Sequence, residues 1–174
     1  GFAMYRSKAS KYNVVDATPF GRDPIEEIAE ACRATGVKLG LYYSQDLDWS
    51  DPNGGGRRVE YGCYKDLKVS DETRYWGNDW DFADTPDYDF QRYLNEKSMP
   101  QIEEILTQYG DLCLIWFDVP MTLTKEQSRA FVDLVRKHQP GCLVSGRIGN
   151  DLGDCFTPGD NEVTDKTEAG NLYE

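Results

Sequence analysis

A short apolar segment, Leu112–Phe117, constrains the fold of this chain more than any other stretch. Aromatic and β-branched side chains fill it, and it follows the helix-breaking Gly110, so it is predicted to be a buried strand. Strict alternation places its side chains on two faces: Leu112, Leu114 and Trp116 on one, and Cys113, Ile115 and Phe117 on the other. Because both faces are apolar, the segment is typical of a parallel strand covered on both sides.

The predicted strand ends on a carboxylate, Asp118, and Pro120 then prevents further strand pairing. By the period of two, Asp118 shares a face with Trp116. Catalytic groups in α/β proteins collect at the carboxyl ends of parallel strands. Asp118 is therefore a candidate nucleophile or general base, and the alternative is that it only accepts hydrogen bonds from the following turn.

The rest of the chain alternates helices with strands. Capping residues and apolar repeats of helical spacing predict helices that begin after Asp23, after Asp87 and after Thr124. Pro100 should kink or divide the second of these helices. The further predicted strands are residues 37–44 and 142–147, and residues 1–5 are expected to form the end of another strand. This order is typical of α/β folds.

Polar or charged residues end each of these strands, namely Tyr42 to Ser44, Asp118 and Arg147. Helices separate the strands in the order of a (β/α) barrel, whose site lies at those carboxyl ends. A doubly wound phosphate-binding domain is the competing architecture, but it requires a glycine-rich turn between strand and helix. No such turn is present in the sequence, which therefore favours the barrel.

Residues 45–84 show no clear periodicity but are rich in aromatic, acidic and amide side chains. Long irregular loops are usually functional or disordered, and the aromatic content argues against disorder. A wall of a sugar-binding site and simple loop packing remain alternative interpretations. Asp46, Asp48 and Asp51 could suggest a calcium loop, but their spacing does not fit one. The net charge of −12 argues against a nucleic-acid partner.

Several segments together resemble the α-L-fucosidase family of retaining glycosidases: Gly1-Phe2, Gly40–Ser44, Ile115–Asp118, Ser145–Arg147 and Gly159–Asn161. The similarity extends through essentially the whole chain. In the family pattern, Asp118 matches the catalytic nucleophile and Trp116 an aromatic residue of the fucose pocket. Tyr42 matches a tyrosine near the sugar, and Arg147 an arginine that holds the substrate and the surroundings of the nucleophile. Glu174 matches the general acid/base, with Tyr173 in place of the usual Trp.

The resemblance implies that residues 1–174 are part of a single catalytic barrel domain, truncated at both ends. A full (β/α)8 barrel needs about 250 residues, so this chain is expected to supply an incomplete TIM-like barrel, about its middle half. The family's His-His-Asp, which normally precedes Gly-Phe, is absent. The isolated chain is accordingly expected to be inactive.

The function implied is release of L-fucose by a two-step retaining mechanism, from a fucosylated glycan or a small fucoside. A non-catalytic carbohydrate-binding relative with the same fold is the alternative. No metal and no organic cofactor is expected, and no apolar run approaches the length of a membrane span. The resemblance is compatible with a secreted, periplasmic or lysosomal protein.

Overall fold

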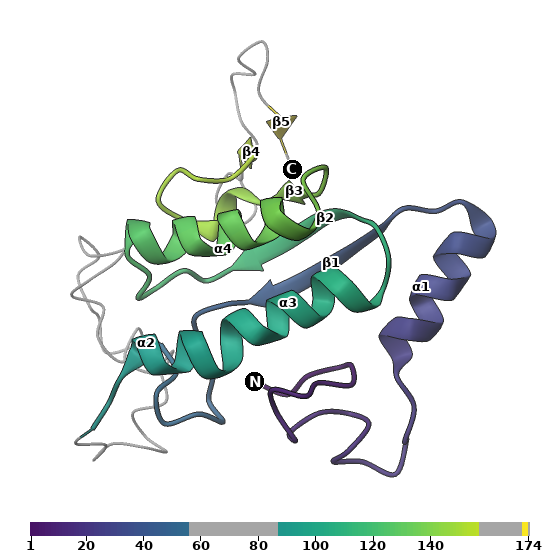
Figure 1. Ribbon diagram of the computed structural model, residues 1–174, viewed down its shortest axis with the longest axis horizontal. Helices are drawn as coiled ribbons and strands as arrows, with labels where there is room; N and C mark the ends of the chain where they lie inside the picture. Colours follow the sequence, from purple (N-terminus) through teal and green to yellow (C-terminus); the bar gives the residue numbers. More distant parts are fainter. Residues whose placement is uncertain (56–86, 157–171, 174) are drawn as a thin grey trace.

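A computed structural model describes residues 1–55, 87–156 and 172–173 of the chain. Its centre is a three-stranded parallel sheet in the order β1-β2-β3. The strands are β1 (Leu39–Ser44), β2 (Leu112–Asp118) and β3 (Leu143–Val144). Helices α3 (Met99–Gln108) and α4 (Lys125–His138) contact each other and lie across the sheet in Figure 1. The predicted α/β class with a parallel sheet is thereby confirmed, while the incomplete barrel stays a prediction.

Helices α1 (Pro24–Thr35) and α4 begin where their capping residues predict. The Asp23 side chain accepts hydrogen bonds from the first turn of α1, and Gly36 ends the helix in a left-handed conformation with φ of 72°. Thr124 and Gln127 form a complete capping box at the start of α4. Local sequence chemistry therefore fixes the ends of these two helices.

The predicted long helix before β2 is divided into three parts. It consists of α2 (Phe90–Tyr93), a π-helical segment (Leu94–Ser98) and α3. Pro100 lies at the start of α3, directly after the π-helical segment, and its missing N–H group interrupts the regular hydrogen bonding of a continuous helix. The division thus falls immediately before Pro100, and the helix begins at Phe90, later than the sequence indicated.

The pairing of β1 with β2 shifts register between Leu39 and Gly40, which pair with Leu112 and Leu114. Cys113 is therefore an extra residue in β2, and it interrupts the alternation of side chains. Leu112 is buried, as are Ile115 and Phe117, whereas strict alternation assigned it to the face of Trp116. The sequence prediction was wrong for this residue because a bulge leaves no mark in an all-apolar segment.

The core lies between the sheet and helices α3 and α4. Fully buried side chains come from the sheet and from both helices, among them Ile102, Ile115, Phe117, Phe131 and Val135. Phe117 and Phe131 meet edge to face, with ring centroids 5.6 Å apart. On the other face Tyr42 is 59% exposed. In the part of the chain that the structure describes, helices α3 and α4 cover one face of the sheet, whereas Leu114 and Trp116 on the other face are only partly buried. The prediction of a strand buried on both faces thus holds fully for one face.

Two predicted strands are shorter in the structure. In residues 1–5, Ala3 alone forms a bridge, to Asn13, and the segment continues to Ser7, whose hydroxyl donates to Glu104 of α3 at 2.8 Å. Strand β3 ends at Val144 and a 3₁₀ turn (Gly146–Ile148) follows. Beyond it, β4 (Cys155–Phe156) pairs in parallel with β5 (Leu172–Tyr173).

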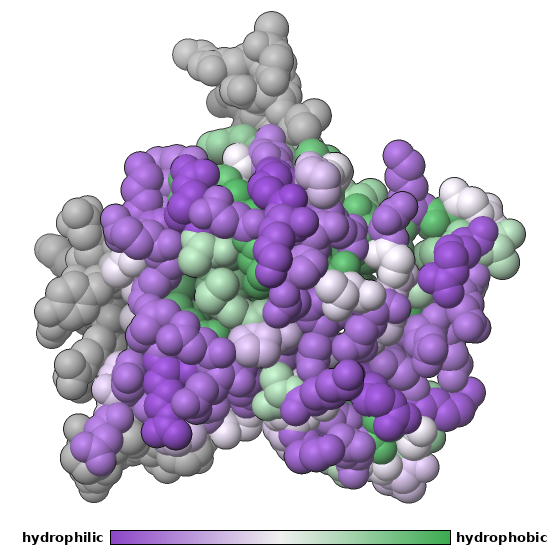
Figure 2. Space-filling model, in the orientation of Figure 1, coloured by the Kyte–Doolittle hydropathy of each residue, from purple (hydrophilic) through white to green (hydrophobic). Residues whose placement is uncertain are grey.

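Figure 2 shows the helix-covered side of the molecule, where hydrophilic residues predominate and apolar ones show between α3 and α4. This is the surface expected of helices that bury one side against a sheet. Within residues 1–55 and 87–156, no helix is long and apolar enough to cross a membrane.

Candidate active site

The carboxylate of Asp118, at the end of β2, contacts side chains from both neighbouring strand ends. Its Oδ2 accepts a hydrogen bond from the Tyr42 hydroxyl at 2.9 Å. Its Oδ1 lies 3.2 Å from Nη1 of Arg147, which follows β3. The Asp118 side chain is 19% exposed, so the group is partly shielded but can be reached. Three residues that the sequence placed at separate strand ends thus meet around one carboxylate.

Register explains why Tyr42 and Trp116 accompany Asp118. Tyr42 pairs with Trp116, and Ser44 pairs with Asp118, in adjacent parallel strands. Residues that pair or lie two apart share a face of the sheet, so both rings lie on the face of Asp118. Burial, and then the hydrogen bond to Asp118, raises the pKa of Tyr42 to about 12. The Tyr42 hydroxyl therefore keeps its proton and donates a hydrogen bond to the carboxylate.

The main chain immediately after Asp118 is strained. Val119 has a φ of 56°, a left-handed conformation that is unfavourable for a β-branched residue. In this conformation its N–H donates to Asp118 Oδ1 at 3.0 Å. Such strain costs of order 1–3 kcal/mol and is found mainly at functional sites. The strain therefore supports a functional role for this strand end.

Two fully buried polar side chains hold the end of β2. Oε1 of Gln45 accepts from the Asp118 N–H at 3.0 Å, and Nε2 of Gln45 donates to the Arg147 carbonyl at 3.3 Å. The hydroxyl of Ser145 donates to the Phe117 carbonyl at 3.0 Å. The sequence analysis missed Gln45. The sequence offered one weak indication of its role: Gln45 directly follows the predicted strand 37–44, which ends at the site.

The acidic residues after β1 are engaged by protein donors. Asp46 Oδ2 accepts from the backbone N–H groups of Thr122 and Leu123 in the loop after β2. Asp48 pairs with Lys97 at 2.7 Å. A Cβ at Gly55 would lie 1.5 Å from Asp46 Oδ1, so only glycine fits there. Within the described ranges, no group of three or more potential metal ligands could hold a metal ion.

Asp46 should make the stability of the protein depend on pH. Burial raises the pKa of its carboxyl group well above the ordinary range of an aspartate, to about 7, although the Thr122 and Leu123 hydrogen bonds oppose this change. A raised pKa gives a stabilisation that is complete below the unfolded pKa and is lost as pH rises through the folded pKa. The free energy of unfolding should therefore fall between about pH 4 and pH 7. In Asp46→Asn this loss should be absent.

Thermal unfolding of the complete protein at a series of pH values measures the effect. The midpoint of Asp46→Asn relative to wild type should rise between about pH 4 and pH 7. Asp48→Asn is the matched control: burial acts to raise the pKa of Asp48, but its hydrogen bonds and the positive charge of Lys97 at 2.7 Å act to lower it. Its difference from wild type should stay constant over this range. Parallel curves for wild type and Asp46→Asn would contradict the prediction.

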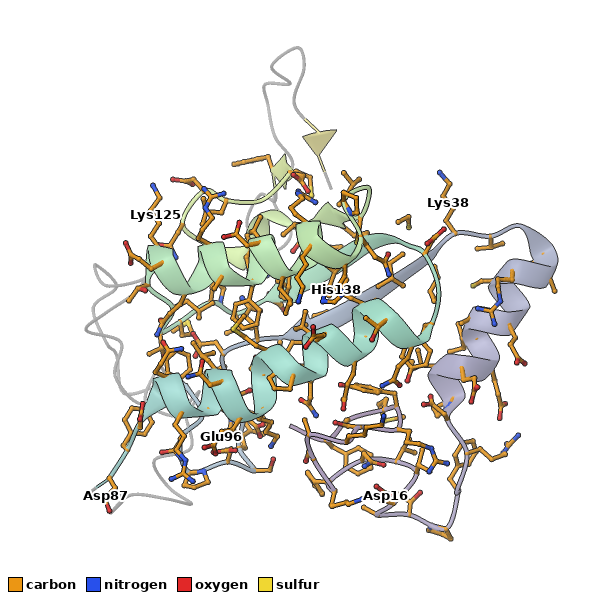
Figure 3. All side chains as sticks on the ribbon, viewed as in Figure 1. Asp16, Lys38, Asp87, Glu96, Lys125 and His138 are labelled. Atoms are coloured by element: carbon orange, nitrogen blue, oxygen red, sulfur yellow. The ribbon has the colours of Figure 1, made fainter. Side chains whose placement is uncertain are left out.

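The structure describes Arg147 and several other polar and aromatic residues, but it does not describe Glu174. Arg147 contacts Asp118, whereas the nearby loop acid Asp154 is bound by Arg136. Figure 3 shows His138 on the side of α4 that faces α3, where its ring lies 2.7 Å from Glu103. Glu174 lies outside the described residues, as do residues 56–84 of the aromatic loop. Trp49, within the described part of that loop, is 59% exposed.

Comparisons with known proteins identify relatives of the whole chain. The family model for alpha-L-fucosidases matches residues 1–174. The solved structure of unliganded alpha-L-fucosidase AlfC from Lactobacillus casei is 51% identical, with a TM-score of 0.81; the match covers 94% of this chain and 49% of AlfC. The alpha-L-fucosidase from Vibrio sp. strain EJY3 is 35% identical, with a TM-score of 0.74, over 91% of this chain and 26% of that protein.

Alpha-L-fucosidase isoenzyme 1 from Paenibacillus thiaminolyticus is 32% identical, with a TM-score of 0.70, over 91% of this chain and 37% of that protein. Among curated proteins, none matches the chain significantly. The chain thus spans about half the length of AlfC.

Proposed function

Since this chain belongs to the alpha-L-fucosidase family, we propose that it is part of a retaining glycosidase that releases L-fucose from fucosylated glycans or small fucosides. The observation that carries the proposal is the Asp118 carboxylate at a strand end, contacted by both Tyr42 and Arg147. AlfC has been solved with alpha-L-fucose product, and a variant of it with 4-nitrophenyl-a-L-fucopyranoside. These complexes support a fucoside as the substrate here.

Asp118 acts as the nucleophile in this proposal. One carboxylate oxygen forms a bond to the anomeric carbon of fucose while the glycosidic bond breaks, and a general acid protonates the departing oxygen. The same acid then acts as a base, taking a proton from the water that displaces Asp118. The overall configuration is retained because the anomeric carbon is inverted twice.

The neighbours of Asp118 fit this role. Tyr42 and Arg147 contact different oxygens of the carboxylate, so together they fix its rotation as well as its position. Preorganised donors of this kind cost no rearrangement when the reaction occurs. The Trp116 ring, on the same face, provides an apolar surface for the sugar.

The second carboxyl group of the mechanism must lie about 5–5.5 Å from the nucleophile in a retaining enzyme. We assign this role to Glu174, on the basis of the family pattern at Tyr173-Glu174. The chain supplies part of a catalytic (β/α)8 barrel, and the other strands complete the pocket. By itself the chain lacks those walls and does not turn over substrate.

Proton NMR of a fucoside hydrolysis tests the mechanism. The complete enzyme is mixed with an aryl α-L-fucoside, and the first sugar released should be the α-anomer, followed by slow mutarotation. An α-fucoside incubated with dilute acid, which yields both anomers, is the control. Initial release of the β-anomer would contradict the retaining mechanism. Binding of the fucoside without hydrolysis would instead favour the carbohydrate-binding alternative.

A further inference from the structure

The end of β2 carries the Asp118 carboxylate, but the main chain of β3 does not support it. Strand β3 pairs with β2 only through Leu114 and Ile115. Beyond Ile115, the Ser145 hydroxyl bonds to the Phe117 carbonyl, and the Gln45 amide, which directly follows β1, bonds to the Asp118 N–H. Among the described residues, main-chain pairing therefore reaches Asp118 only from β1, through Ser44, and the side toward Arg147 depends on side-chain groups.

Gln45 connects the main chain at Asp118 with the main chain at Arg147. Its side chain is completely buried, and its single amide accepts from the Asp118 N–H and donates to the Arg147 carbonyl. The main chain of Gln45 is held in turn by Ser98 of the π-helical segment, whose hydroxyl donates to the Gln45 carbonyl at 2.8 Å. One planar amide thus sets the separation between the backbones that carry Asp118 and Arg147.

We propose that Gln45 is a positioning residue of the glycosidase, which holds the nucleophile Asp118 and its partner Arg147 in reactive alignment. The inference rests on the proposed function, because alignment has a consequence only if Asp118 attacks the sugar. Gln45 is shielded from substrate and exchanges no proton with it. Its contribution is geometric, and small misplacements at a reacting centre can lower rates by about a hundredfold.

Gln45→Met, measured in the complete enzyme, tests the proposal. Methionine fills a similar volume but makes neither hydrogen bond. We expect kcat for an aryl α-L-fucoside to fall by roughly tenfold or more, with KM changed by less than about threefold, because Gln45 does not touch the substrate.

Gln101→Met is the matched control. Gln101 is also buried, and its amide likewise bonds at both ends, accepting from the Tyr43 hydroxyl at 2.7 Å and donating to the Ser7 hydroxyl at 3.1 Å. Its substitution should lower the thermal midpoint to a similar degree but change kcat by less than about twofold. If the wild-type enzyme is active and Gln45→Met and Gln101→Met have equal kcat values, Gln45 has no positioning role.

Ser98→Ala serves if Gln45→Met does not fold, because it removes only the hydroxyl that holds the Gln45 carbonyl. It should lower kcat by about threefold with KM unchanged, and an unchanged kcat would overturn the proposal. The activity of the wild-type enzyme separates a failure of the proposed fucosidase function from a failure of the proposed role of Gln45. Absence of fucosidase activity in wild type would overturn the proposed function together with this role, whereas active wild type with active Gln45→Met overturns this role alone.

Discussion

Replacing Asp118 by Asn should abolish nearly all turnover in the complete enzyme, lowering kcat by about a thousandfold or more because the amide cannot form the covalent fucosyl intermediate. Folding should be almost unaffected, since Asn has the shape of Asp and can still accept from the Tyr42 hydroxyl. Steady-state hydrolysis of an aryl α-L-fucoside measures the loss. Added azide should restore part of the turnover in a smaller variant, Asp118→Gly, by occupying the place of the carboxylate.

Asp154→Asn is the matched control for Asp118→Asn. Asp154 is also partly exposed and also pairs with an arginine, Arg136, but it lies outside the cluster around Asp118. Its substitution should leave kcat within about twofold of wild type. If Asp118→Asn retained near-normal release of fucose, Asp118 would not be the nucleophile and the proposed mechanism would be wrong.

Arg147→Lys should lower kcat/KM by about a hundredfold, although it keeps the positive charge. The guanidinium of Arg147 reaches Asp118 Oδ1 with Nη1 at 3.2 Å while it is only 27% exposed. Arginine presents several donors in a rigid plane, whereas lysine offers one mobile ammonium group. Lysine therefore cannot reproduce an alignment that fixes the carboxylate and the sugar together.

The same substitution at Arg136 separates this effect from the loss of an ordinary ion pair. Arg136 pairs with Asp154, and a pair of this kind near the surface contributes at most about 1 kcal/mol. Arg136→Lys should therefore leave kinetics unchanged and lower stability slightly. Wild-type kinetics for Arg147→Lys would show that its contact with Asp118 has no part in the reaction.

The sequence predicts the meeting of Tyr42, Asp118 and Arg147 because the carboxyl ends of parallel strands lie at one edge of a sheet. Each residue could be placed by finding where an apolar segment stops. The capping residues Asp23 and Thr124 likewise fixed the start of their helices. These predictions succeeded because a local pattern determines each of them.

Other features depend on contacts between distant segments, and no local pattern reveals them. Gln45 bonds to residues far along the chain, at Asp118 and Arg147. The early end of β3 follows from Ser145, whose hydroxyl bonds to the Phe117 carbonyl. The left-handed conformation of Val119 runs against the preference of valine, so sequence rules would place it elsewhere.

The extra residue at Cys113 makes the two ends of β2 respond differently to changes in chain length. Because Leu112 and Leu114 both pair with successive residues of β1, a residue gained or lost near Cys113 only changes the bulge. A residue gained or lost between Leu114 and Asp118 would instead turn the carboxylate toward the apolar helix-covered face. During evolution, insertions and deletions in this strand should therefore be confined to its beginning, and the count from Leu114 to Asp118 should stay constant.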